Sequence, residues 1–291
     1  IVRLKFLHGY KYKEIAAESD MPIRVNAMIG VNLEENRLTL VKQGHIKTAD
    51  DTLQINSVKI SADGALGSRG AALIHDYSDM PGHKGLLLIQ PDKLKTLMKT
   101  AMQHGFQVNT HAIGDNANHI VLNHYQNLIK ETDTKNMRHR VEHAQVLKIT
   151  DIPRFSELGV IASMQSTHAT SDKNMAETRL GPERIKGAYA WRSLLNNNAI
   201  IAQGSDFPVE SANPFYGIHA AVTRQDHQNQ PENGWYANER MTLVETIESF
   251  TTNFFPLNRA KSVPISAPSM SESKIVSVPT FATTLSMIKS S

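Results

Sequence analysis

The chain has 291 residues, of which 40% are hydrophobic and 20% are charged, a composition typical of folded globular proteins rather than disordered ones. A formal net charge of +3 is too small and too scattered to indicate binding to nucleic acid or to an anionic membrane. The sequence contains no cysteine, which excludes disulfides, thiolate metal ligands and a cysteine nucleophile. Any metal ion must therefore be bound by histidine, carboxylate or modified lysine.

The sequence shows no sign of a membrane segment. No apolar run approaches the roughly 18 residues that a membrane span needs, and the first residues lack the layout of a signal peptide. We therefore expect a soluble protein with no membrane partner, with the cytoplasm as the default location.

Taken in order, the chain alternates between β-favouring runs and helical patterns. This alternation predicts an α/β fold with a parallel sheet of six strands, because antiparallel sheets do not need a helix between strands. Strands are expected at about 22–30 and 55–64, in the runs that end at His111 and His143, at 159–165, and in the run from 199 toward Asp206. Helices are expected at about 8–18, 31–45, 92–103, 116–130, 152–158, 184–195, 214–223 and 242–252.

Two segments depart from this alternation. The segment from about 63 to 91 is long, irregular and glycine-rich, and such segments in compact domains are usually functional loops. The segment 258–291 is rich in Ser, Pro, Thr and Lys and has no helical period, which predicts an irregular or disordered tail. We therefore predict two regions, a barrel-like region over 1–257 and the tail over 258–291.

Four side chains that can carry chemistry sit on or at the ends of separate predicted strands. They are His111, His143 and Asp206, each at the end of a β-favouring run, and Lys59 within its run. If these strands lie parallel in one barrel, the four side chains converge at the carboxyl-end rim, where such barrels place their active sites.

These residue types suit a metal-assisted hydrolysis. Neutral imidazoles bind Zn²⁺ and similar divalent ions well, and a carboxylate completes such a ligand set. A bound ion lowers the pKa of water and polarises a carbonyl group, which is how an amide is hydrolysed near neutral pH. The carboxylate of Asp206 would bind the ion and move the proton from water to the leaving nitrogen. Lys59 would join only after deprotonation or carbamylation.

Other polar residues near the predicted rim are candidates for substrate contacts. Gln165 and His168 follow the strand at 159–165, and Asp63 and Arg69 lie in the long loop. Glu142 immediately precedes His143, so strand alternation predicts that it faces away from the site and has a structural role.

Six motifs occur in fixed order along the chain: VKISADGALGSR from 58 to 69, THAIGD from 110 to 115, RHRVEHAQ from 138 to 145, QSTH from 165 to 168, LGPER from 180 to 184 and GSDFPV from 204 to 209. Together they resemble the amidohydrolase family 3 branch of the amidohydrolase superfamily, which includes N-substituted formamide deformylase-like enzymes. The resemblance implies a metal-dependent (β/α)₈ TIM barrel acting on carbon–nitrogen bonds other than peptide bonds, with His111, His143, Asp206 and carbamylated Lys59 as metal ligands and a small amide as substrate.

The sequence also departs from that family's pattern. The family has a His-x-His pair on its first barrel strand, and this sequence contains no His-x-His. Counterparts of the first two strands and of the β-sandwich formed by the chain ends are missing as well. We therefore expect an incomplete, N-terminally truncated barrel that binds one divalent ion weakly at most, with open sheet edges that a homo-oligomer would cover.

Three functional alternatives remain open from the sequence. The first is a metal-dependent amidohydrolase. The second is an inactive or unstable fragment of such an enzyme, which metal content would distinguish from the first. The third is a metal-free Schiff-base lyase that uses Lys59, which borohydride trapping with a carbonyl substrate would reveal.

Overall fold

The structure, a computed structural model, describes residues 25–31, 35–49 and 53–254. Its sheet has the strand order β1-β3-β4-β5-β6-β7, and neighbours along this path are parallel. A short additional strand, β2, pairs antiparallel with β3. The strands are β1 (Val25–Gly30), β2 (Ile46–Lys47), β3 (Leu53–Ser61), β4 (Gln107–Ala112), β5 (Arg140–His143), β6 (Ile161–Met164) and β7 (Ile201–Gln203).

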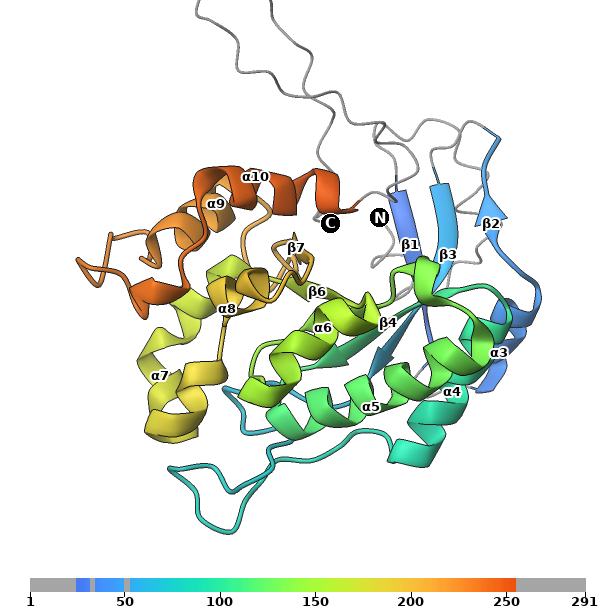
Figure 1. Ribbon diagram of the computed structural model, residues 1–291, viewed down its shortest axis with the longest axis horizontal. Helices are drawn as coiled ribbons and strands as arrows, with labels where there is room; N and C mark the ends of the chain where they lie inside the picture. Colours follow the sequence, from blue (N-terminus) through green and yellow to red (C-terminus); the bar gives the residue numbers. More distant parts are fainter. Residues whose placement is uncertain (1–24, 32–34, 50–52, 255–291) are drawn as a thin grey trace, which may run out of the picture.

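Helices connect successive strands, and α4, α5 and α6 lie along one side of the sheet (Figure 1). The α-helices are α3 (Glu35–Lys42), α4 (Pro91–Gln103), α5 (Asp115–Thr132), α6 (Ile152–Leu158), α7 (Ser166–Arg184), α8 (Trp191–Asn196), α9 (Pro214–Thr223) and α10 (Leu243–Phe250). Short 3₁₀ helices occur at Lys135–Met137, Ile149–Asp151, Ile185–Gly187, Ala237–Glu239 and Thr252–Phe254.

Helix α4 illustrates how the sequence specifies these elements. Pro91 stands in its first turn, where the missing N–H costs nothing and the fixed φ favours a helix. Asp92 follows and interacts favourably with the positive end of the helix dipole. Its buried side chains recur at helical spacing and form a stripe that packs on the sheet. They are Leu94, Leu97, Met98, Ala101 and Met102.

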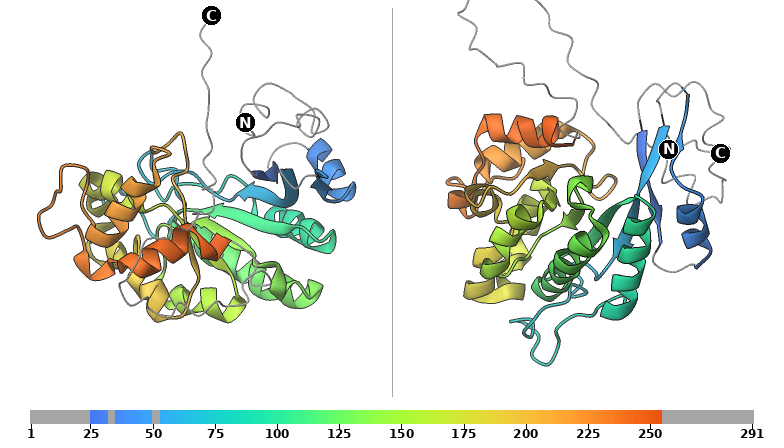
Figure 2. Two further views of the ribbon diagram at one scale, coloured as in Figure 1. Left: turned by 90° about the horizontal axis from the view of Figure 1, so that it is seen from above. Right: turned by 45° about the vertical axis from the view of Figure 1, so that its right-hand side comes forward.

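The sheet does not close into a barrel within the described residues. The strands β1, β3 and β2 lie at one end of the molecule, and α9 and α10 lie at the other (Figures 1 and 2). The prediction of an incomplete barrel with six parallel strands is therefore confirmed. The homo-oligomer expected to cover its edges stays a prediction.

Three elements differ from the sequence expectation. The single helix expected at 184–195 is wrong, because α7 ends at Arg184, a 3₁₀ helix spans Ile185–Gly187 and α8 begins at Trp191. Helix α7 itself is not among the expected helices. The strand β2 was not expected either. The predictions for 8–18 and for 258–291 fall outside the described residues, as does the start of the strand expected at 22–30.

Strand register sets the arrangement of the site. In the parallel ladders Ser61 pairs with His111, His111 with Glu142, and Glu142 with Ser163. Paired residues of parallel strands point to the same face of the sheet. This register therefore places His111 and Glu142 on one face, near the carboxyl ends of their strands.

Stability should depend on pH through His139, which is buried just before β5. Its Nδ1 accepts the Val108 N–H at 3.0 Å and its Nε2 lies 3.1 Å from the Thr134 hydroxyl. Burial lowers the pKa of His139 to about 4, against about 6.5 in an unfolded chain. Between these values the unfolded state binds more protons, so this contribution is present above pH 6.5 and is lost as the pH falls toward 4.

We expect this loss to reach about 3 kcal/mol, since one pKa unit corresponds to about 1.4 kcal/mol. The measurement is urea unfolding at a series of pH values for the wild type and His139→Gln, which can keep both hydrogen bonds without titrating. A smaller pH dependence in His139→Gln would support the assignment, and identical curves would contradict it.

Candidate functional site

Two of the predicted ligands lie together at the end of neighbouring strands. The rings of His111 on β4 and His143 on β5 have centroids 4.5 Å apart and cross at 72°. His168, in the first turn of α7, also stacks on His143, with ring centroids 5.9 Å apart. Three imidazoles thus form a contiguous row, and two come from the strand ends that the sequence indicated.

The backbone at His143 explains why its neighbour Glu142 does not face away from the site as strand alternation predicts. His143 has φ 78° and Ala144 has φ 45°, so the extended backbone ends there and side-chain alternation stops. Glu142 keeps the register of His111 on the same face and accepts a hydrogen bond from Ser163 Oγ at 2.6 Å. The expectation that Glu142 faces away from the site is therefore wrong, and a strained backbone of this kind leaves no clear signal in sequence.

Both strand-end imidazoles are held in the neutral form. Burial lowers the pKa of His111 to about 4, and the charge of Lys59 acts in the same direction, against a backbone hydrogen bond at Gly64. Burial also lowers the pKa of His143 well below its usual value, helped by Lys59 and His111. A neutral imidazole keeps one lone pair available for a ligand. The pair therefore has the protonation state that metal binding requires.

Lys59 lies on β3 beside this pair and is partly buried. Its burial lowers the pKa of the ammonium group, while the carboxylates of Glu142 and Asp206 raise it. Lys59 thus combines a desolvated amine with two nearby acidic groups. Whether this side chain binds a metal ion stays a prediction.

Asp206 lies beyond the end of β7, in an exposed turn where its φ is 52°. Its electrostatic contact with Lys59 places it toward the site. Within 25–31, 35–49 and 53–254, however, no three His, Asp or Glu side chains come together as a metal-binding group. The two imidazoles therefore fit a divalent ion in donor type and protonation, and supply two of the ligands that such an ion needs.

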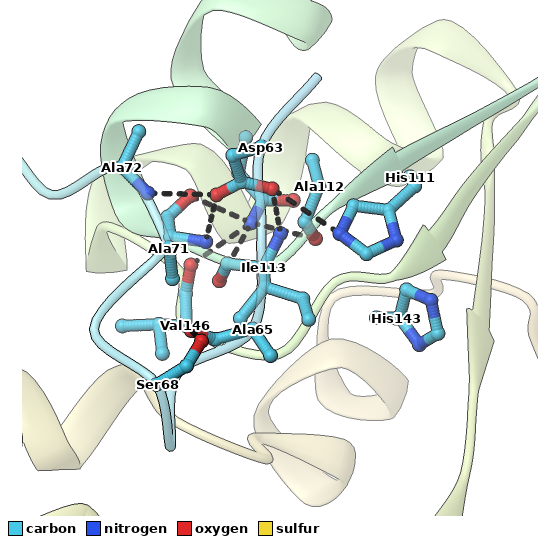
Figure 3. Close-up of polar contacts among 12 residues, drawn as sticks. Asp63, Ala65, Ser68, Ala71, Ala72, His111, Ala112, Ile113, His143 and Val146 are labelled. Carbon is cyan, nitrogen blue, oxygen red and sulfur yellow. Dashed lines mark hydrogen bonds and ion pairs between the residues drawn. The ribbon is translucent and has the colours of Figure 1, made fainter. Parts of the chain in front are cut away.

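Asp63 is buried behind His111 (Figure 3). Its Oδ1 accepts the Ile113 N–H at 2.9 Å, and its Oδ2 accepts the N–H groups of Ala72 at 2.9 Å and Gly114 at 2.8 Å. The same Oδ1 lies 3.5 Å from His111 Nε2. Burial raises the pKa of Asp63 to about 7, against the lowering effect of the three N–H donors. This carboxylate joins the long loop, the turn after β4 and the imidazole.

The other predicted substrate contacts also have protein partners. Gln165 Oε1 lies 2.7 Å from His143 Nδ1, and Arg69 forms a double hydrogen bond with Asp79 in the long loop. Asp79 also pairs with Arg179 of α7, which fastens the loop to that helix. His168 Nε2 is buried and makes no hydrogen bond within the described residues. Of the four predicted contacts, His168 is thus the one whose side chain has a polar atom without a hydrogen-bond partner in the described residues. Substrate binding by these four residues stays a prediction.

A family model described as "Amidohydrolase family" matches residues 10–254, most of the chain. The chain belongs to the amidohydrolase family. It is 36% identical over 217 residues to "Protein LONG AFTER FAR-RED 3" of Arabidopsis thaliana, covering 73% of this chain and 36% of that protein. It is 32% identical over 241 residues to "Putative amidohydrolase YtcJ" of Bacillus subtilis, covering 82% of this chain and 44% of that protein.

Two solved structures of metal-dependent hydrolases have a similar fold. An uncharacterized metal-dependent hydrolase from Pyrococcus horikoshii superposes with a TM-score of 0.70 at 27% identity, covering 83% of this chain and 47% of that one. A second one, from Pyrococcus furiosus, gives 0.69 at 28% identity and covers 86% and 48%. The predicted family and α/β barrel-type fold are thus confirmed, and the chain spans less than half the length of these relatives. None of the described helices is long and apolar enough to span a membrane.

Proposed function

We propose that this amidohydrolase-family chain carries part of a metal-dependent active site that hydrolyses a carbon–nitrogen bond of the amide or formamide type in a small molecule. The observation that carries the proposal is the pair of neutral imidazoles at adjacent strand ends, the buried His143 and the partly buried His111. Parallel barrels place their chemistry at this end of the strands. The metal-dependent hydrolases with similar folds support the reaction class.

In this proposal His111 and His143 hold one divalent ion, with Zn²⁺ as the first candidate because imidazole suits it. When bound, such an ion activates water and polarises a carbonyl oxygen. Asp206 is proposed to join the ligands and to accept the proton of the attacking water. Lys59 in its carbamylated form would supply a further oxygen ligand. His168, the third imidazole of the row, would contact the substrate.

The first test is metal binding. We expect the purified chain to bind Zn²⁺ weakly in a competition titration, because two imidazoles form an incomplete ligand set. His143→Ala should weaken binding at least about 100-fold, since losing even an outer-shell partner of a ligand costs 10–100-fold. The matched control is His104→Ala, which removes an exposed histidine that bonds only the Thr100 carbonyl of its own helix.

Turnover of an N-substituted formamide is the second measurement. We expect little or no hydrolysis by the chain as given, because a loosely held ion positions its water poorly and a displacement of about 1 Å can cost roughly 100-fold in rate. A fused family-type N-terminal segment with a His-x-His pair should increase both affinity and rate. Equal Zn²⁺ affinity in wild type and His143→Ala, with and without that segment, would refute the metal site.

A further inference from the structure

We propose that Asp172 and Tyr189 are positioning residues that fix the imidazole of His168 on α7 relative to the imidazole of His143 at the end of β5. They do so through Gln145, which closes a hydrogen-bonded cluster between the two elements. The inference rests on the proposed function, because both imidazoles belong to the proposed site, in which His168 contacts the substrate.

The turn that follows β5 is one side of this arrangement. His143 and Ala144 have φ values of 78° and 45°, in the left-handed region that residues with a Cβ rarely adopt. Such a backbone persists only where the surrounding structure holds it in place. Gln145 comes next, and its carbonyl accepts the Tyr189 N–H at 2.8 Å. The direction of the His143 ring therefore depends on how firmly Gln145 is held.

Three side chains from separate parts of the chain meet in the cluster. Asp172 Oδ2 accepts hydrogen bonds from the Tyr189 hydroxyl and from Gln145 Nε2, both at 2.6 Å. Gln145 Nε2 also lies 2.5 Å from the Tyr189 hydroxyl oxygen, which closes a ring of three contacts. Gln145 is 5% exposed and Tyr189 is 1% exposed, so water competes little for these hydrogen bonds. The amide, the phenol and the carboxylate thus hold one another in place.

Tyr189 is itself held from several sides. Its backbone has φ 51°, and its carbonyl accepts Arg224 Nη1 and the Trp191 N–H, both at 3.0 Å. Its ring packs against the ring of Trp235, with centroids 5.4 Å apart and an angle of 64° between the planes. Tyr189 therefore connects the cluster to a rigid, buried part of the protein.

Asp172 carries this constraint to His168. It lies four residues after His168 on α7, so both side chains lie on the same side of the helix. Burial raises the pKa of Asp172, and the opposing effects include the hydrogen bond from Tyr189 and the charge of His168. The His168 ring stacks on His143 with 22° between the planes. A closed path thus runs from His143 through Gln145 and Asp172 to His168, and back through the stacked rings.

The consequence for function concerns the free nitrogen of His168. Its Nε2 is buried and makes no hydrogen bond within the described part of the chain, so a substrate can bond to it. Because the cluster fixes the spacing of the two rings, a substrate group on His168 Nε2 would lie at a fixed distance from the ion proposed at His143. Such precision matters, since a displacement of about 1 Å can cost roughly 100-fold in rate.

Histidine ring signals of the metal-free protein test the positioning directly. In protein labelled with ¹³C in its histidine rings, His143→Gln and His168→Gln assign the two signals by their loss. We expect a nuclear Overhauser effect (NOE) between the two rings in the wild type. Asp172→Ala should abolish this NOE and shift both signals, whereas Asp172→Asn keeps an oxygen that accepts both hydrogen bonds and should restore the NOE. A wild-type NOE in Asp172→Ala would overturn the inference.

A milder variant decides the question if Asp172→Ala does not fold. Tyr189→Phe removes one hydroxyl and keeps the packed ring, and we expect it to weaken the NOE and to shift both signals. Unchanged signals in Tyr189→Phe would contradict the role of Tyr189. The matched control is Lys173→Ala, which removes the 2.6 Å ion pair between α7 and Asp226 and should leave both signals unchanged. Equal shifts in Lys173→Ala and Asp172→Ala would show that any loosening of α7 moves the rings, and the assignment would be wrong.

Zn²⁺ titration separates this inference from the proposed function. Asp172→Ala should weaken Zn²⁺ binding by about tenfold, as expected when an outer partner of a ligand is lost, and Lys173→Ala should not weaken it. The expected changes in the ring signals, in a protein that binds no Zn²⁺, would refute the proposed function and leave the positioning intact. Unchanged ring signals in both Asp172→Ala and Tyr189→Phe would overturn the positioning at any Zn²⁺ affinity.

Discussion

Replacing Arg224 with methionine should destabilise the protein by about 3–5 kcal/mol, because a buried carbonyl loses its donor and a buried cation–π contact is lost. Arg224 is fully buried at the end of α9. Its Nε donates to the Trp235 carbonyl at 2.8 Å and its Nη1 to the Tyr189 carbonyl at 3.0 Å. Its guanidinium carbon lies 4.3 Å from the ring centre of Trp191, a cation–π distance.

Methionine fills a similar space but has no donor, so the buried Trp235 carbonyl would lose the Arg224 Nε–H, whereas the Tyr189 carbonyl would keep the Trp191 N–H at 3.0 Å. An unpaired buried carbonyl costs about 1–3 kcal/mol, and a desolvated cation–π contact contributes about 2 kcal/mol. Part of this loss is offset because the guanidinium no longer has to be desolvated, a cost visible in the lowering of the pKa of Arg224 to about 10 by burial. The Trp235 carbonyl gains no new donor from that change, so we expect the net effect to stay destabilising.

Thermal and urea unfolding measure the change, with a decrease in Tm of roughly 10 °C expected for a domain of this size. Lys186→Ala is the control, because Lys186 pairs with Glu183 in an exposed ion pair that contributes little. If Arg224→Met were as stable as the wild type, the desolvation cost of the guanidinium would equal the stabilisation from its hydrogen bonds and its cation–π contact, and the prediction would be wrong.

The sequence predicted the pairing of His111 and His143 because strand ends in a parallel sheet meet at one edge. It could not predict Glu142, since the left-handed φ of His143 reverses the alternation that a strand normally imposes. The same limit applies to Asp206, where a positive φ follows a strand of three residues. Local patterns indicate which residues reach the rim, whereas such backbone turns decide which way their side chains point.

Helix α7 was missed for a different reason. Its first turn contains Ser166, Thr167 and His168, which favour turns and caps as much as helix interiors. Its last turns include Gly181, with φ 74°, followed by Pro182, and a Gly-Pro pair predicts the end of a helix. The helix is stabilised by tertiary contacts that the sequence pattern does not contain, such as the hydrogen bonds from Arg184 to the carbonyls of His75 and Asp76.

The roles of Asp63 and Gln165 also required the structure. Both occur in motifs near the rim, which suggested substrate contacts. Their actual partners are His111 and His143, residues 48 and 22 positions away in sequence. Contacts over such separations depend on the folded arrangement of the strands and of the long loop. Sequence position alone therefore cannot distinguish a substrate contact from an imidazole-positioning group.

Gly114→Ala should lower the stability of the protein by an amount comparable with Arg224→Met, because the added methyl group separates the long loop from the end of β4. Gly114 follows β4 and packs directly on the loop backbone. An added Cβ would lie 2.5 Å from the carbonyl carbon of Ala72 and closer still to its oxygen. The obstacle is backbone rather than a flexible side chain, so the loop or the turn must move.

That movement would pull Ala72 and Gly114 apart, although both donate to Asp63. We expect a loss of about 3 kcal/mol, at the upper end of the usual overpacking cost, and weaker Zn²⁺ binding because Asp63 would no longer be held against His111. Urea unfolding and limited proteolysis within 62–90 measure the two consequences of loop release.

The matched control is Gly67→Ala in the same loop, where an added Cβ meets only the Met175 side chain at an ordinary 3.5 Å. We expect Gly67→Ala to unfold and to resist proteolysis like the wild type. Equal stability of the two variants would mean that the loop yields at Ala72 without cost. In that case the link from Ala72 through Asp63 to His111 could not be rigid, because the same three groups share one carboxylate.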